Sequence, residues 1–153
     1  MNPFFNSDER RSALLAESLR WIGTPWFANS AACGKRGGVS CHNLPRAILM
    51  AVGALPNDFP MITGDPNGTR HSNQSVIEPW IDGRREFVPV EDWQDIEVGD
   101  LIGIRIYRCL DHLAVCIEPG WMIHVLMHKH TARDLIVDPT WSSRILRVWR
   151  PVA

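Results

Sequence analysis

A cysteine stands between a glycine-rich loop and a predicted helix in the stretch GGVSCHNLPRAIL, residues 37–49. A cysteine nucleophile reacts as the thiolate, and a helix N-terminus or a nearby imidazolium lowers the pKa of a thiol. Aligned peptide dipoles place roughly half a positive charge at the start of a helix, and the unpaired N–H groups there can stabilise an oxyanion. The position of Cys41 therefore indicates a catalytic thiol.

Two starting points are open for this helix. If the helix begins at Cys41, Pro45 lacks the N–H group that would bond the Cys41 carbonyl. If Asn43 is the N-cap, the helix proper starts at Leu44, and Pro45 lies in the first turn, where proline is tolerated. In both cases Cys41 lies within about one turn of the positive end of the helix.

Two histidines in consecutive predicted strands supply candidates for the base that such a thiol needs. His112 opens the strand HLAVCI, and His124 lies in the next strand, WMIHVLM, after a turn around EPGW. Side chains alternate between the two faces of a strand, so the turn decides whether the two rings share a face.

The length of this turn leaves two registers open. A two-residue turn at PG pairs His124 with Val115, on the face opposite His112. A three-residue loop over 118–120 pairs His124 with Ala114, and the two rings then become diagonal neighbours on one face. We expect the second register because it makes a relay, in which the thiol attacks, the first histidine accepts the proton and the second histidine orients the first.

The elements that must position these residues follow from local patterns. Residues 6–22 predict a helix, with Asn6 and Glu9 at capping-box spacing. Its predicted apolar stripe is Leu15, Leu19 and Ile22. The helix after the cysteine has the predicted buried stripe Leu44, Ala47, Ile48 and Ala51, and ends at Gly53.

The middle of the chain is broken by prolines and turn-forming pairs. Residues 27–40 and 54–71 predict loops, and the long second loop is a candidate cap for a cleft. Residues 72–83 predict a short helix interrupted near Pro79. Four strands are predicted at residues 100–107, 112–117, 121–127 and 144–152. Helices followed by strands predict an α+β fold with a mostly antiparallel sheet.

Bulk composition excludes several classes of protein. A chain of 153 residues with 45% apolar residues predicts one domain over residues 1–153. A net charge of −1 gives no electrostatic footprint for nucleic acid. Neither a membrane-spanning run nor a secretory signal is evident, so we expect a cytoplasmic protein, as synthesised, with free thiols. The cluster HVLMHKH matches no standard zinc spacing, so no metal or cofactor is expected.

Four motifs follow one another along the chain: GTPW (23–26), SCHN (40–43), VGDL (98–101) and HLAVCIEPGWMIHV (112–125). Their order and the spacing of the two histidines resemble the NlpC-type papain-like cysteine peptidases, which cut peptide bonds in bacterial peptidoglycan. The corresponding motifs of that family are GTPY, DCSG, PGDL and HVGIYLGNGRFIHA. The resemblance covers roughly residues 12–150, and the closing VWRPV is similar to phage-associated members.

The resemblance implies a papain-like α+β fold with a central antiparallel sheet and a role for each matched residue. Cys41 matches the nucleophile, His112 the base and His124 the third polar residue. Trp26 matches the aromatic residue near the substrate carbonyl, which is usually a tyrosine.

This chain departs from the family pattern beside the nucleophile. Ser40 replaces the usual Asp, His42 the usual Ser and Asn43 the usual Gly. An indole N–H at Trp26 also replaces a tyrosine hydroxyl. We therefore expect Trp26 and His42 to contact the substrate differently from their counterparts.

The sequence predicts a cysteine peptidase or amidase acting on cell-wall or related short peptides. Two alternatives remain open. One is a non-enzymatic phage-tail or assembly component that retains the fold, with phage-tail proteins as partners. For either kind of protein, a location in the virion or release to the cell wall after synthesis also stays open. The other is a thiol acyltransferase, although the order of cysteine before histidine favours the peptidase arrangement.

Overall fold

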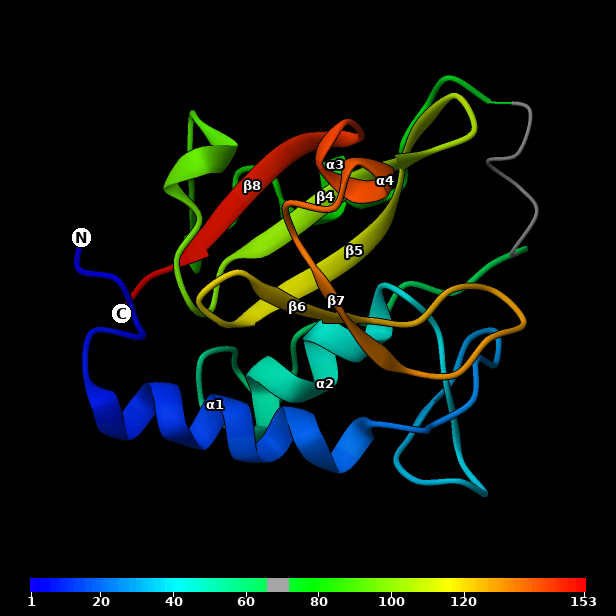
Figure 1. The fold of residues 1–153 in the computed structure, drawn as a ribbon, viewed down its shortest axis with the longest axis horizontal. Coiled ribbons are helices and arrows are strands. Elements are labelled where there is room, and N and C mark those ends of the chain that lie inside the picture. The colour runs from blue at the N-terminus through cyan, green and yellow to red at the C-terminus, as the bar shows by residue number, and fades with distance from the viewer. Residues whose placement is uncertain (66–71) are drawn as a thin grey trace.

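A computed structural model of the protein describes residues 1–65 and 72–153 (Figure 1). The predicted loop 54–71 therefore lies partly outside the described residues. The helices are α1 (Asp8–Trp21), α2 (Asn43–Ala51), α3 (Ile77–Ile81) and α4 (Pro139–Ser142), with a 3₁₀ turn, η1 (Trp93–Asp95). The strands are β1 (Ala31–Ala32), β2 (Gly38–Val39), β3 (Phe87–Pro89), β4 (Leu101–Ile106), β5 (Cys109–Glu118), β6 (Trp121–His124), β7 (Ala132–Leu135) and β8 (Ile145–Pro151).

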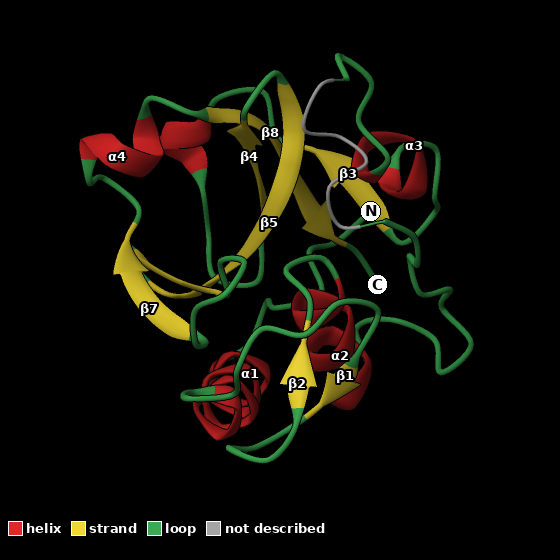
Figure 2. Ribbon diagram, turned by 90° about the vertical axis from the view of Figure 1, so that its right-hand side faces the viewer, coloured by secondary structure: helices red, strands yellow, loops and turns green. Residues whose placement is uncertain are grey.

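Six strands form one sheet in the order β3-β8-β4-β5-β6-β7, and all neighbouring pairs are antiparallel. Figure 2 shows α1 and α2 together on one side of this sheet, with α4 away from them. The predicted α+β class with a mostly antiparallel sheet is confirmed.

The four predicted strands correspond to β4, β5, β6 and β8. The prediction missed β3 and β7, which lie at the two edges of the sheet, and the short β1–β2 pair inside the predicted loop 27–40. Edge strands are commonly short and carry charged residues or proline, so they show little apolar alternation. The sequence of β7, Ala-Arg-Asp-Leu, has this character.

The N-cap of helix α1 lies one residue later than predicted. Ser7 is its N-cap, and the Ser7 hydroxyl accepts a hydrogen bond from the Arg10 N–H at 3.2 Å. The predicted cap at Asn6 is therefore wrong. The predicted stripe is also wrong, because Leu19 and Ile22 are exposed. The residues buried in this helix are Leu14, Ser18 and Trp21. The sequence did not predict this stripe because it contains a polar residue, Ser18. The Ser18 hydroxyl can be buried because it donates a hydrogen bond to the Leu14 carbonyl.

Helix α2 starts at Asn43 with His42 as its N-cap, so both predicted starts are off by one or two residues. Pro45 lies in the first turn, where its missing N–H group costs little. The helix buries Leu44, Ile48 and Leu49, whereas Ala47 and Ala51 of the predicted stripe are not buried. Helix α3 contains Pro79 in its first turn and is not interrupted there, which corrects that prediction.

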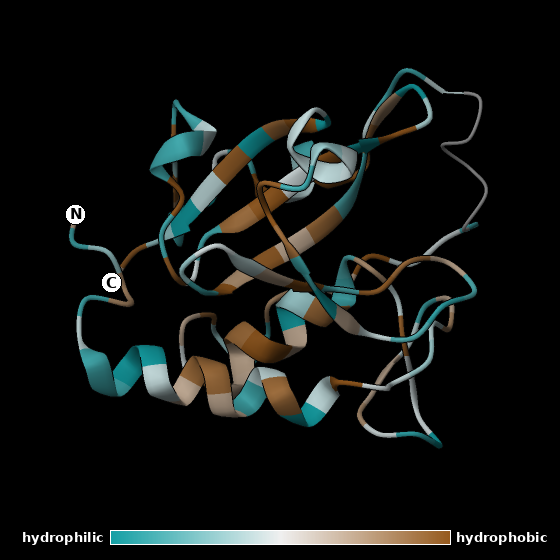
Figure 3. Ribbon diagram, viewed as in Figure 1, coloured by the Kyte–Doolittle hydropathy of each residue, from teal (hydrophilic) through white to brown (hydrophobic). Residues whose placement is uncertain are grey.

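The sheet separates two apolar layers, and Figure 3 shows apolar segments along the strands and along parts of α1 and α2. One layer packs α1 and α2 against the sheet face that carries Leu113, Val115 and Ile117. The other layer covers the face that carries Ala114 and Cys116, and it includes Trp141 of α4. None of the described helices combines the length and the apolar character that a membrane span requires.

Two residues of the VGDL motif, Gly99 and Asp100, make close contacts with other parts of the fold. Gly99 has φ +99°, and the ring of Phe5 lies where a Cβ atom would be. Asp100 is 1% exposed and accepts two hydrogen bonds from the guanidinium of Arg150, at 2.9 and 2.8 Å. Since Arg150 belongs to the closing VWRPV, the two motifs meet as one partly buried ion pair between the start of β4 and β8.

Candidate active site

Cys41 lies directly before the N-cap of α2, as the sequence predicted within one turn. Its side chain is half-buried, and its thiol donates to the Asp111 carbonyl at 3.7 Å. The sulfur also lies 3.6 Å from Nδ1 of His42. The start of α2 and the first half of β5 therefore meet at the sulfur.

A β-bulge places Asp111 beside the thiol. His112 pairs with Ile104, but the next pair joins Leu110 to Arg105, so Asp111 is the extra residue in β5. A bulge releases one residue from the regular ladder and re-aims its neighbours, and bulges are frequent next to active sites. This bulge brings the Asp111 carbonyl to Cys41 and sets His112 at the wall of a cavity.

The hairpin between β5 and β6 has the predicted register but not the predicted turn. Cys116 pairs with Met122 and Val115 with Ile123, which places His124 across from Ala114. However, the turn has two residues, because Glu118 pairs with Trp121. The register survives because Ile117 forms a bulge that compensates for the shorter turn.

The two imidazoles are joined as the relay requires. His112 Nε2 lies 2.8 Å from His124 Nδ1, and both side chains are 2% exposed. Beyond them, His124 Nε2 lies 2.6 Å from Oδ2 of Asp134. Asp134 was not among the residues predicted from the sequence. Since His124 pairs with Ala132 in the β6–β7 ladder, Asp134 is its diagonal neighbour on the same face. A correct prediction of β7 would have found it.

Trp141 packs against both rings of the relay. Its ring is stacked on His112 at 6.3 Å between centroids and meets His124 edge-on at 4.8 Å. Trp141 is itself 9% exposed. The indole therefore fixes the planes of the two imidazoles and keeps water from their inner side.

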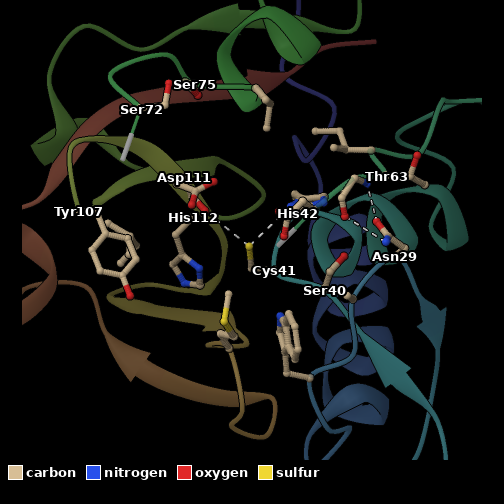
Figure 4. A pocket seen from close by; sticks show the side chains of 18 of the residues that line it. Asn29, Ser40, Cys41, His42, Thr63, Ser72, Ser75, Tyr107, Asp111 and His112 are labelled. Atoms are coloured by element: carbon tan, nitrogen blue, oxygen red, sulfur yellow. Dashed lines mark hydrogen bonds between the residues drawn. The ribbon is translucent and has the colours of Figure 1, made fainter. Parts of the chain in front are cut away.

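A cavity of about 710 Å³ opens in front of these residues (Figure 4). Cys41, His112, His42 and Trp26 all lie on its wall, whereas His124 is buried behind His112. About half of the other lining residues are apolar, namely Ala28, Ile62, Val76, Pro79, Ile106, Tyr107, Leu126 and Met127. The polar ones are Asn29, Ser40, Thr63, Asp65, Ser72, Gln74, Ser75 and Asp111. The five residues predicted for catalysis and substrate contact are thus brought together at one place in the fold; their roles stay a prediction.

The GTPW motif fixes Trp26 at the cavity. The Trp26 N–H donates to the Lys129 carbonyl at 2.8 Å, and Trp26 also bridges to Val39, two residues before Cys41. Its indole packs edge-on against His128, with 5.2 Å between ring centroids. The motif therefore ties the segment after His124 to the segment before Cys41.

Burial sets the protonation of the site. Burial, and then the charge of Asp111, raise the pKa of the Cys41 thiol to about 12, although the N–H groups of Leu113, His42 and Cys41 itself act in the opposite direction. The expected lowering of the thiol pKa by the helix start is therefore wrong, because desolvation outweighs these N–H groups.

The three histidines are also shifted by burial. Burial, followed by the charges of His124 and His42, holds the pKa of His112 well below its usual value. Burial lowers the pKa of His42 to about 4. It also lowers the pKa of His124, with Asp134 acting in the opposite direction. At neutral pH the resting site thus contains a neutral thiol and neutral imidazoles.

His128 and His130 are both exposed, as expected for a turn after β6. Within residues 1–65 and 72–153, no group of three or more His, Cys, Asp or Glu side chains is arranged to hold a metal ion.

No protein-family model and no curated protein matches the sequence. Among solved structures, the chain is similar to a protein from Staphylococcus aureus subsp. aureus Mu50 of the NLP/P60 family, described as similar to lipoprotein. The two share 14% sequence identity with a TM-score of 0.64, over 100% of this chain and 45% of the other. The chain thus spans less than half the length of that protein. This likeness establishes the architecture: the chain has the α+β fold of an NLP/P60-family protein.

Proposed function

We propose that this chain is a cysteine hydrolase that cleaves an amide bond in a short peptide, with Cys41 as nucleophile and His112 as base. One observation carries the proposal. Cys41 and His112 lie on the wall of one cavity, and His124 is hydrogen-bonded behind His112. A nucleophile, a base and a group that orients the base are the minimum set for covalent acyl transfer.

The protonation of the resting site determines the first step. Because the thiol is neutral, attack of Sγ on the carbonyl carbon is coupled to transfer of the thiol proton to His112. The carbonyl oxygen gains the negative charge. The N–H groups of Cys41 and His42 already favour a negative sulfur, and we expect them to stabilise this oxyanion as well.

The remaining steps return the enzyme to its starting state. The protonated His112 gives its proton to the amine as the C–N bond breaks, which leaves a thioester on Cys41. His112 then takes a proton from water, the resulting hydroxide attacks the thioester, and the proton returns to the sulfur as the acid departs. No net proton is gained or lost at the site.

The proposed substrates are short peptides of the bacterial cell wall. This part of the proposal comes from the motif resemblance and from the NLP/P60 name of the structural relative. A cavity of about 710 Å³ lies within the range of small-ligand sites and accommodates a few residues of peptide. Trp26 and His42 line the same cavity and are the proposed substrate contacts.

Digestion of purified peptidoglycan fragments, followed by mass analysis, tests the proposal. We expect two products whose masses sum to the substrate plus one water, and no product with Cys41→Ala. Cys33→Ala is the matched control, because Cys33 is an exposed free thiol that does not line the cavity. Absence of cleavage by the wild-type chain, or equal cleavage by Cys41→Ala, contradicts the proposal.

A second candidate is a non-enzymatic assembly component that retains this fold, with phage-tail proteins as its partners. The observation that favours it is the neutral resting thiol, whose proton is donated to the Asp111 carbonyl and not to His112. This candidate predicts that Cys41→Ala and wild-type chains assemble equally with a partner and that neither cleaves any fragment.

A further inference from the structure

We propose that Asp134 is a positioning residue that fixes the tautomers of His124 and His112, so that Nδ1 of His112 is the nitrogen that accepts the thiol proton. The effect on rate rests on the proposed hydrolase function. The tautomers themselves are a property of the resting protein and are tested without a substrate.

The outer end of the relay determines which nitrogen of His124 carries the proton. An ionised carboxylate only accepts hydrogen bonds, so the 2.6 Å contact requires that Nε2 of His124 carries the proton and donates it to Asp134. Burial keeps the His124 ring neutral at pH 7. A neutral imidazole has one N–H group, so Nδ1 of His124 holds a lone pair and acts as an acceptor.

The same reasoning applies to the inner ring. The 2.8 Å contact joins Nδ1 of His124 to Nε2 of His112, so Nε2 of His112 must be the donor. His112 is also buried and neutral. Its Nδ1 therefore holds the lone pair, and Nδ1 is the nitrogen left to receive the proton of Cys41.

Without the Asp134 carboxylate, the hydrogen bond between the two imidazoles could equally run in the opposite direction, with donor and acceptor exchanged. Nδ1 of His124 would then donate to Nε2 of His112, and Nδ1 of His112 would carry a proton. In that order His112 cannot accept the thiol proton. Asp134 selects the productive order because only that order gives it a donor, in a charge-assisted hydrogen bond.

The surrounding contacts keep Asp134 and the two imidazoles in this arrangement. Its backbone pairs with Met122 in the β6–β7 ladder, diagonal to His124. The neighbouring cation, Arg133, is bound to Glu118 at 2.8 Å. Trp141 packs on both imidazoles and restricts rotation of either ring.

Nuclear magnetic resonance of ¹⁵N-histidine-labelled protein at pH 7 is the decisive experiment. We expect Nε2 of both His112 and His124 to be protonated in the wild-type protein and Nδ1 of both to be unprotonated. In Asp134→Asn, whose amide can accept or donate, we expect a mixture with the reversed order. Protonated Nδ1 on His112 in the wild type, or unchanged tautomers in Asp134→Asn, overturns the proposal. The wild-type measurement holds even if a variant fails to fold.

The kinetic arm uses a cell-wall peptide that the wild-type chain cleaves. Where a carboxylate contacts the base directly, its amide replacement lowers kcat by about 10⁴-fold through the wrong tautomer. Since Asp134 acts through a second imidazole, we expect kcat to fall about 10- to 100-fold in Asp134→Asn, with KM unchanged. We expect Asp134→Glu to restore part of the rate.

Glu118→Gln is the matched control, because it removes a carboxylate from an exposed ion pair with Arg133, the neighbour of Asp134 on the edge strand β7. An equal loss of kcat in Glu118→Gln and Asp134→Asn would show a general effect of the edge and overturn the positioning role. Expected tautomers with no hydrolysis of any fragment would instead count against the proposed function and leave the tautomer assignment standing.

Discussion

Two polar networks cross this sheet, and each ends in an aspartate. At one end, Asp100 holds Arg150 in a two-pronged ion pair and also accepts from the Glu97 N–H at 2.9 Å. At the other end, Asp134 holds His124, which in turn meets His112. In the first network the carboxylate is the buried member, at 1% exposure; in the second the imidazoles are buried and the carboxylate side chain is 43% exposed.

The difference shows what each network can do. An arginine never loses its proton in a protein, so the Asp100–Arg150 pair can only hold β4 and β8 in place. Neutral imidazoles carry one movable proton each, so the second network can accept a proton at one end while staying intact. Both aspartates bind neighbours on other strands, but only one of them contacts groups suited to chemistry.

The largest expected effect is a loss of activity when the imidazole network is broken. His112→Ala removes the proposed base, and we expect kcat/KM on a cell-wall peptide to fall by about 10³- to 10⁴-fold. Steady-state cleavage assays measure it, with His130→Ala as the control because His130 is exposed and outside the cavity. Retention of more than a tenth of the wild-type rate would remove His112 from the mechanism.

Asp100→Ala is the matching test for the Asp100–Arg150 network, and its readout is stability. Loss of the carboxylate removes two charge-assisted hydrogen bonds from Arg150, which is 20% exposed and keeps Glu97 at 3.6 Å, so we expect the free energy of unfolding to fall by about 2–3 kcal/mol. Urea denaturation followed by tryptophan fluorescence measures the change. A loss below about 1 kcal/mol would show that the ion pair does not stabilise the sheet.

Acid pH should lower the stability of the folded protein through its buried histidines. An unfolded histidine titrates near about 6.5, whereas burial lowers the pKa of folded His42 to about 4 and that of His112 well below its usual value. Above the unfolded pKa both states are neutral and stability is constant. As pH falls below it, the unfolded chain binds protons that the folded chain does not. Stability then falls by up to about 1.4 kcal/mol per pH unit for each such histidine.

Thermal unfolding between pH 7.5 and 4.5 measures this slope. We expect Tm to fall with pH, and the slope to be smaller in His42→Gln, which removes one buried titrating group. A Tm that stays constant or rises over this range would show that the histidines are not buried in their neutral form.

The smallest expected effect on stability comes from an exposed ion pair that belongs to neither of the two networks. Glu118 and Arg133 form an exposed ion pair at 2.8 Å. Exposed pairs contribute roughly 0–1 kcal/mol, so we expect Glu118→Gln to change the free energy of unfolding by less than about 1 kcal/mol. Denaturation and cleavage assays check both quantities, and a large loss in either would assign Glu118 to one of the networks.

The sequence allowed the inner part of the fold to be predicted because central strands are apolar and long. Strands β4, β5 and β8 were evident from their branched residues, whereas the edge strands β3 and β7 were missed. The helix α1 was found with the wrong buried face, because Ser18 is buried through a hydrogen bond that composition does not reveal.

The candidate site divides in the same way. The sequence pointed to Cys41, His112 and His124 through their types and spacing. Asp134 was missed because it lies on an unpredicted edge strand, and Trp141 because tryptophan gives no sign of which ring it packs on. The raised pKa of Cys41 also required coordinates, since it depends on burial and on the nearby Asp111.

The bulge at Ile117 limits how the β5–β6 hairpin can vary in length. Two residues of turn and one bulged residue together set the spacing from His112 to His124. Inserting or deleting a single residue in a paired part of either strand would move one imidazole to the opposite side of the sheet, unless a gained or lost bulge or turn residue compensates for it, as Ile117 does here. In variants and natural relatives that keep the relay, a one-residue change within the strands of this hairpin should therefore be accompanied by a change in the bulge or in the turn.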